Sequence, residues 1–351
     1  DDIWNDLKFY NFGAVGPQLN QIAKDLQVTY DSRHQAESVG EIKEFVDKLG
    51  ELQQYQKSLK LHTGISSRVL SQVKIGEGGD GAEDEESLFN RTIELEQDFI
   101  ADNYDNKTSC DKILELLYEG DLPKESIFRL CCLLSLAKNG IRDKEFQILK
   151  TEIVDTYGIE VLFTLEKLTK YGWFVNKSSF LSYSHWKDFR SFSNALNLLP
   201  QNEDDVNPSK PMDANFAYGG IVPITTRIVQ SCFDRSVVSK SYSSQQPFII
   251  SRTPTWFKLD EMFVQQYGPD VVREQIWDSS ASSKTKIIGS PNRASADTAF
   301  IVFIGGVSLG EVATLQYVSK KLKEKGINKR FIIVTDGVIN GEKLVKSVLT
   351  I

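Results

Sequence analysis

The turn from Gly305 to Glu311 has residue types that could bind phosphate. Its glycines lie between an apolar run and a helical stretch, and backbone amides at the start of a helix can bind anions. The spacing matches neither common phosphate-binding pattern, because no lysine follows Gly310 and Glu311 adds a negative charge. We therefore expect these glycines to serve a tight turn and close helix–sheet packing. A nucleotide-binding α/β enzyme that uses this turn is the alternative.

The same turn also contains the glycine–serine–glycine spacing of a hydrolase nucleophile, in Gly306, Ser308 and Gly310. That pattern requires an acid and then a histidine after the serine. All three histidines of the chain, His34, His62 and His185, precede Ser308. Without a base the serine hydroxyl is not activated. We predict no catalytic residue and no enzyme activity.

Neither the cysteines nor the histidines have the spacing of a metal site. The four cysteines form no CxxC pair, and Cys131 and Cys132 lie in an apolar run, where small buried thiols are common. The histidines show no zinc-binding spacing. The sequence thus predicts no metal or other cofactor and a reducing compartment, the cytoplasm.

The charge of the chain is unevenly distributed. Forty-one Lys and Arg against 48 Asp and Glu give a net charge of −7. Eleven acids and one base lie between Glu77 and Asp105, so that the rest of the chain is nearly neutral. A helix predicted over 159–171 could imitate a DNA-recognition helix, but its charges are mixed. We expect no nucleic-acid partner, whose binding would need many cationic contacts.

Helical periodicity dominates the first two-thirds of the chain. The pattern predicts an antiparallel hairpin whose first helix starts at Pro17, whose tip lies near residues 31–38, and which a short helix over 66–73 follows. A Gly- and Glu-rich linker then leads into a helical bundle, with a short strand and one more helix after it. The predicted segments are helices 88–101, 109–118, 123–138, 143–157 and 159–171, strand 173–176 and helix 180–199.

The last part of the chain has the pattern of a strand–helix–strand unit. Apolar runs at 299–304 and 330–335 flank a helical stretch at 308–325, and a short helix follows at 342–349. The predicted fold class is mixed α/β, predominantly α-helical: a helical hairpin, a helical bundle and a partial α/β domain with parallel strands. The domain bounds are 1–75, 76–215 with an acidic linker at 76–87, and 216–351 with a flexible loop at 279–297.

Several stretches together resemble the Sec1-like SM family, which regulates SNARE-mediated membrane fusion. These are Leu52 to Thr63, Tyr218 to Pro223 with Arg227, and Phe300 to Glu311. The stretches that resemble its vacuolar protein sorting branch, the SM subunit of the HOPS and CORVET tethering complexes, are Phe12 to Leu19, Ser38 to Lys43, and Ile127 to Leu136 with Thr156 to Gly158.

This resemblance implies that the chain is the C-terminal half of such a protein. In the family's naming, the hairpin would be domain 3a, the helical bundle domain 3b, and the α/β part the returning half of domain 2. It further implies SNARE partners, with syntaxin-like and R-SNARE motifs, held on the hairpin. The residues chosen near the tip are Gln21, Lys24, Gln27, Tyr30, Arg33 and Lys43.

A second surface follows from the resemblance to the vacuolar branch. Lys150, Ile159 and Leu162 are implied to dock the C-terminal helical segment of a class C tethering-complex subunit. Ile159 and Leu162 are three residues apart and could face one groove, or both could belong to the core. The implied location is cytoplasmic, peripheral on late endosome and vacuole or lysosome membranes, with only indirect membrane contact.

Overall fold

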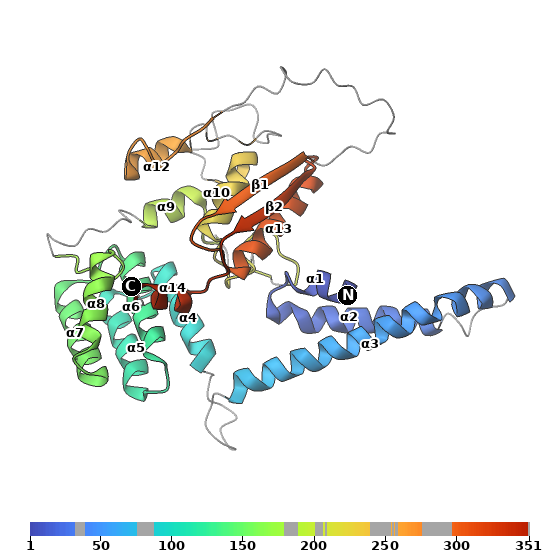
Figure 1. Ribbon diagram of the computed structural model, residues 1–351, viewed down its shortest axis with the longest axis horizontal. Helices are drawn as coiled ribbons and strands as arrows, with labels where there is room; N and C mark the ends of the chain where they lie inside the picture. The colour runs from blue at the N-terminus through green and yellow to red at the C-terminus, as the bar shows by residue number, and fades with distance from the viewer. Residues whose placement is uncertain are drawn as a thin grey trace. The chain divides into compact units, whose positions relative to one another are not determined.

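The chain forms two compact units, one made of Asp1–Gln97 and Pro200–Ile221, the other of Asp98–Leu199 and Val222–Ile351. The computed structural model describes residues 1–31, 39–75, 88–178, 189–200, 206–207, 209–238, 254, 256, 259–275 and 297–349. The predicted class, predominantly helical with a small parallel sheet, is confirmed (Figure 1). The three-domain division stays a prediction. Within the described ranges, no helix combines the length and apolar character that crossing a bilayer requires.

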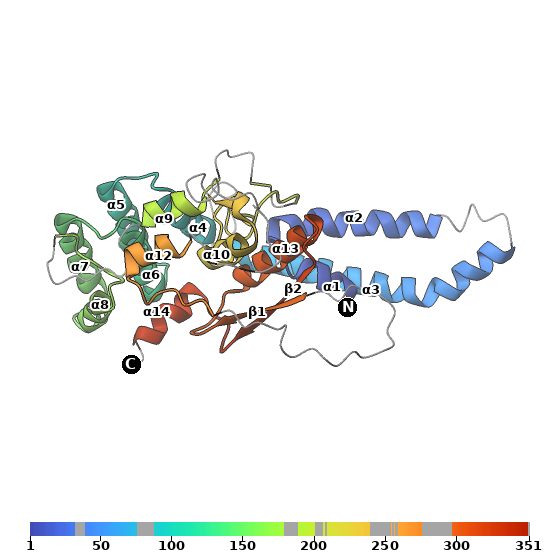
Figure 2. The ribbon, with the colours of Figure 1, turned by 90° about the horizontal axis from the view of Figure 1, so that it is seen from above.

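The first unit contains the predicted hairpin. Helices α2 (Phe12–Asp31) and α3 (Val39–Ile75) lie side by side, and the short α1 (Asp2–Leu7) packs on α3 (Figure 2). Apolar side chains from all three helices meet in one cluster, because each helix carries apolar residues at three- and four-residue steps. The buried members are Ile3, Leu7, Val15 and Leu19, with Tyr10, Ile22, Tyr55 and Leu59 packed against them. Of the predicted tip near residues 31–38, only Asp31, the last residue of α2, lies within the described residues.

Two predictions about the hairpin helices were wrong. Helix α2 begins at Phe12, so that Pro17 lies inside it and not at its start. The Asn11 side chain accepts a hydrogen bond from the Gly13 amide at 2.9 Å and fixes this earlier start. Helix α3 runs without interruption to Ile75, so no separate helix over 66–73 exists.

The bundle of the second unit agrees closely with the prediction. Glycines follow three of its helices in the backbone conformation with positive φ that side chains disfavour: Gly120 (77°), Gly158 (90°) and Gly172 (74°). A left-handed glycine therefore ends each helix close to its predicted limit. The four helices that lie wholly in the second unit are α5 (Asn106–Glu119), α6 (Lys124–Ala137), α7 (Asp143–Tyr157) and α8 (Val161–Lys170), whereas most of α4 (Leu88–Ala101) belongs to the first unit, which extends to Gln97.

Helix α6 is the most deeply buried helix of this bundle. Its side chains Ile127, Leu130, Cys131 and Leu134 are all fully buried, because α5, α9 and α14 pack against it. The strand predicted at 173–176 appears only as an isolated bridge between Ile141 and Asn176. The helix predicted at 180–199 is present as α9 (Phe189–Leu196), and residues 179–188 lie outside the description.

A two-stranded parallel sheet confirms the predicted strand–helix–strand unit. Strand β1 (Asp297–Phe303) pairs with β2 (Lys329–Thr335), and α13 (Leu309–Glu324) connects them. Helix α13 contacts β2 and α10 (Ile224–Phe233), and the Phe233 ring lies 5.7 Å from that of Phe331. Phe300 and Val302 alternate onto the opposite face, where both side chains are exposed.

The remaining elements complete the second unit. Helix α14 (Gly341–Leu349) matches the predicted C-terminal helix and packs on α6 and α8. Three elements were not predicted from the sequence: α10, the short η3 (Arg235–Val237) and α12 (Asp260–Tyr267). The predicted acidic linker at 76–87 and the predicted loop up to residue 296 lie outside the described residues.

Candidate protein-interaction surfaces

In the turn after β1, two backbone amides donate to carboxylates of the chain itself. The Gly305 amide donates to Asp336, at 3.0 Å to Oδ2 and 3.2 Å to Oδ1. The Ser308 amide donates to Glu311 Oε2 at 2.8 Å. These two amides already donate to carboxylates, so the geometry gives no support to the nucleotide-binding alternative.

Ser308 caps α13 and is not placed as a nucleophile. Its hydroxyl accepts from the Glu311 amide and donates to Glu311 Oε2, which forms a reciprocal capping box. The other Glu311 oxygen accepts from the Thr225 hydroxyl at 2.6 Å. Of the three histidines, only His62 lies in the described part, and its Nε2 is 2.8 Å from Asp1 Oδ2 in the first unit.

The four cysteines are buried free thiols, as predicted for Cys131 and Cys132. Burial raises the pKa of Cys110 and Cys132 to about 12 and that of Cys232 to about 11. Burial also raises the pKa of Cys131. Such thiols stay protonated and are poor nucleophiles and ligands. Among the described residues, no group of three His, Cys, Asp or Glu side chains is placed to hold a metal ion.

The residues predicted near the hairpin tip lie on two helices. Gln21, Lys24 and Gln27 are exposed on α2, Tyr30 is half-buried there, and Lys43 is exposed on α3. Gln21 and Gln27 donate within α2, to Asp25 at 2.8 Å and to Asp31 at 3.0 Å. Steps of three residues turn by about 60° each, so the four α2 residues spread over half the helix circumference. Arg33 lies outside the described residues.

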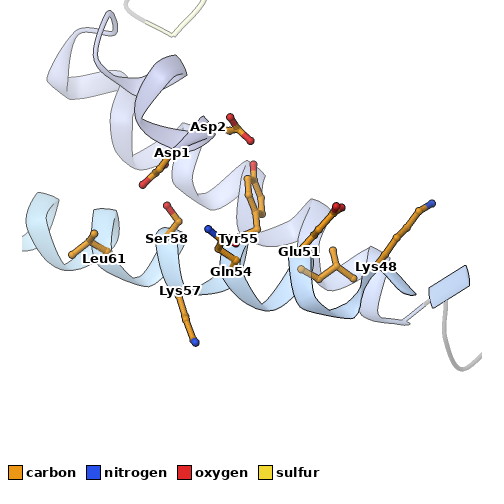
Figure 3. A pocket seen from close by; sticks show the side chains of 10 residues that line it. Asp1, Asp2, Lys48, Glu51, Gln54, Tyr55, Lys57, Ser58 and Leu61 are labelled. Carbon is orange, nitrogen blue, oxygen red and sulfur yellow. The ribbon is translucent and has the colours of Figure 1, made fainter. Parts of the chain in front are cut away.

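A groove of about 800 Å³ lies along α3 beside α1. Figure 3 shows Tyr55 pointing from α3 toward α1, whereas Lys57 points away from it. Desolvation, followed by the nearby Asp6, Asp2 and Asp25 carboxylates, raises the pKa of Tyr55. The residues that line the groove are Asp1, Asp2, Lys48, Glu51, Leu52, Gln54, Tyr55, Lys57, Ser58 and Leu61.

An exposed row of apolar side chains on α3 starts at Leu61, which also lines this groove. Leu61, Ile65 and Val69 follow at four-residue steps and are 58%, 49% and 37% exposed. This stripe was not predicted, because Leu61 was assigned to the return arm of the hairpin and Val69 to a separate helix over 66–73. An unbroken helical pattern from Leu52 to Ile75 was the signal that could have found it.

The second predicted surface, on the bundle, is partly accessible. Ile159 is 67% exposed in the turn before α8, so it does not belong to the core, whereas Leu162 and Lys150 are half-buried. Phe163, four residues after Ile159, is 71% exposed and was not predicted. The helical pattern of the sequence could not show that Phe163 is exposed, because an apolar residue in such a pattern can lie in the core or on the surface.

A family model and several known proteins match this chain. The model of the Sec1 family matches residues 1–347. The vacuolar protein sorting-associated protein 33 of Saccharomyces cerevisiae is 43% identical over 377 residues, which cover 99% of this chain and 53% of that protein. The protein of the same name from Schizosaccharomyces pombe is 26% identical and the 33A protein of Rattus norvegicus 27%, with 98% and 99% of this chain covered.

These relatives carry the name of the vacuolar branch that the sequence resembles. The chain spans about half the length of the curated relatives it matches, 52% of the Schizosaccharomyces pombe protein and 50% of the rat protein. Among solved structures, the SM protein Vps45 in complex with the Qa SNARE Tlg2 matches with a TM-score of 0.46 and 16% identity. That match covers 97% of this chain and 48% of the other.

Proposed function

Because the chain belongs to the Sec1 family, we propose that it is part of a non-enzymatic regulator of SNARE assembly in vacuolar trafficking. The observation that carries this proposal is the match to the family model over residues 1–347, together with the 43% identity to a vacuolar protein sorting-associated protein. The hairpin of α2 and α3 then supplies the binding surface, with syntaxin-like and R-SNARE motifs as its partners.

The proposed mechanism is positioning, with no bond made or broken. Two SNARE helices that bind side by side on one rigid surface lose their translational and rotational freedom before they pair. Zippering from that aligned state requires less ordering than pairing in solution. A long hairpin with its apolar cluster at one end and exposed polar faces is suited to this role.

We also propose that the bundle docks a helical segment of a class C tethering-complex subunit through Lys150, Ile159 and Leu162. The exposure of Ile159 supports this, because Phe163, four residues later in the chain, is exposed as well, and exposed apolar side chains that gather on a surface favour protein binding. The protein would then reside in the cytoplasm, peripheral on late endosome and vacuole membranes through its partners.

The direct test of SNARE binding is a pull-down with syntaxin-like and R-SNARE motif peptides. We expect Lys24→Glu to weaken peptide capture, and substitution of all six tip residues (Gln21, Lys24, Gln27, Tyr30, Arg33, Lys43) to abolish it. Lys320→Glu, at an exposed lysine of α13, is the matched control and should bind normally. Unchanged capture by the six-residue variant would remove this surface from the proposal.

The alternative function is a nucleotide-binding enzyme. Equilibrium dialysis, which measures nucleotide binding directly, distinguishes it from a protein-binding regulator. We expect no retention of labelled ATP or NAD by the chain, because Asp336 and Glu311 hold the amides of the turn. Retention that Glu311→Gln strengthens would favour the enzyme and contradict our proposal.

A further inference from the structure

Helix α12 of the second unit lies against α9 through aromatic rings (Figure 1). The centroid of the Phe192 ring on α9 is 5.4 Å from that of Phe263 and 5.8 Å from that of Tyr267. The Trp256 ring, just before α12, meets the Phe263 ring edge-on at 6.0 Å. Phe192 is only 2% exposed, so the two rings of α12 form part of the cover over α9.

The side of α12 that carries these rings also carries an acid. Asp260, Phe263 and Tyr267 follow at steps of three and four residues, so they share one side of the helix. Burial lowers the pKa of the Arg235 guanidinium on η3. The Asp260 and Glu274 carboxylates act in the opposite direction, which shows that both lie near this cation. Two aromatic rings and a carboxylate near a cation thus hold α12 on the second unit.

Helix α12 has little stability of its own. It has eight residues, and isolated helices shorter than about 12–15 residues are marginal in water. Leu259 at its start makes no side-chain hydrogen bond that would cap the first amides. The helix instead depends on its buried side, where Met262 and Phe263 are 4% and 9% exposed. Its helical shape is therefore coupled to its docking.

The covalent chain does not hold α12 at α9. Twenty residues lie between Val238 and Leu259 in the sequence, and 21 lie between Gln275 and Asp297. Twenty residues can span up to about 66 Å when extended. Packed helices are about 10 Å apart, so this length exceeds what α12 needs in order to leave α9.

We propose that α12 is a displaceable helix and that the surface of α9 around Phe192 is a docking site for a partner helix. Loss of α12 alone exposes Phe192 at a cost of about 25 cal/mol per Å² of apolar surface, so the site favours exchange of one helix for another. The partner helix carries two aromatic residues four positions apart and an Asp or Glu three positions before the first, the pattern of α12 itself. This inference does not depend on the proposed function.

The same arrangement makes α12 a built-in competitor. A segment of the same chain competes at an effective concentration on the order of 1 mM, so that weak ligands are kept out of the site. A partner reaches α9 when it binds more tightly than α12 or when α12 is released. The surface around Phe192 is thus closed to weak ligands while α12 is docked.

The test uses a fluorescent peptide with the sequence of residues 254–268, whose anisotropy is measured with the whole chain. The unaltered chain should bind it weakly, because α12 fills the site. The double variant Phe263→Asp and Tyr267→Asp releases α12 and should bind the peptide with a dissociation constant about tenfold lower. Val271→Asp, at an exposed residue just after α12, is the matched control and should bind like the unaltered chain. A peptide with the two Asp substitutions should bind no variant.

Hydrogen exchange of the unaltered chain gives a second test that needs no variant. The Gly268 amide donates to the Val264 carbonyl at 2.9 Å and reports on the end of α12. The amides of α12 should exchange through a local opening, ahead of those of the buried α6. Exchange of both helices together, only through global unfolding, would overturn the inference.

The peptide experiment can overturn it as well. A double variant that is folded by circular dichroism and binds the peptide no better than the unaltered chain rejects the docking site. If that variant does not fold, Tyr267→Asp replaces it with the same expectation, since Tyr267 is 37% exposed and tolerates a charge. Size-exclusion chromatography adds a third outcome: a dimer that the Asp variants lose identifies a second copy as the occupant and rejects a separate partner.

Discussion

Ser308 and Glu311 hold the first turn of α13 through hydrogen bonds in both directions. The Ser308 hydroxyl accepts from the Glu311 amide at 3.2 Å, and Glu311 Oε2 accepts from the Ser308 amide at 2.8 Å. A serine in a hydrolase-like spacing is therefore a helix cap in this protein. The pair satisfies two amides that a helix start leaves without partners.

Ser308→Ala should destabilise the second unit by about 1 kcal/mol, because one capped amide loses its acceptor. Chemical denaturation followed by circular dichroism measures this loss. Ser308→Thr keeps the hydroxyl and should restore most of the stability. An alanine variant as stable as the unaltered chain would show that the cap contributes nothing.

Gly306→Ala should be more damaging than Gly337→Ala on the neighbouring turn. Gly306 has a φ of 111°, and a Cβ there would lie 2.5 Å from Cγ2 of Ile339. Strain of this kind costs about 1–3 kcal/mol before the clash is added. A Cβ at Gly337 meets nothing within 4 Å, so that variant should stay within about 0.5 kcal/mol. Thermal melts of the two variants make the comparison, and equal melting temperatures would contradict it.

Stability should fall as pH rises above about 9, the ordinary pKa of a cysteine thiol. Burial raises the pKa of Cys110 and Cys132 to about 12 in the folded chain, so the unfolded chain releases these protons first. Since the folded state binds more protons, its stability is full below pH 9 and is lost progressively toward pH 12.

Urea denaturation at several pH values between 7 and 11 follows this loss. Cys132→Ala removes one such thiol and should make the decline shallower, whatever its effect at pH 7. An identical slope in that variant would show that the buried thiol is not the cause.

The single substitutions Ile159→Asp and Phe163→Asp should each leave folding intact and abolish co-purification with the candidate tether subunit. Both side chains are about two-thirds exposed, so a charge there costs the folded chain little. Ile153→Asp is the contrasting variant, since Ile153 is fully buried in α7 and a charge there should collapse the melt. A collapsed melt for Ile159→Asp, or normal co-purification, would contradict the surface.

Much of the fold follows from local sequence. The bundle helices end where Gly120, Gly158 and Gly172 adopt positive φ, which is a property of single residues and their neighbours. The strand–helix–strand unit is likewise visible as two apolar runs around one helical stretch. Helices α10 and α12 were missed because each is short, ten and eight residues, and two to three turns carry little periodicity.

The sequence by itself determined most of the bundle helices and both strands of the parallel sheet, which family the chain resembles, and that its cysteines and histidines have no metal-site spacing. Only the tertiary structure decided which apolar side chains reach solvent, such as Phe163 and Ile65, and which carboxylate meets which amide. Asp336 and Gly305 are 31 residues apart and meet because parallel strands end at one edge. Contacts of this kind depend on how elements pack, and local periodicity carries no information about that packing.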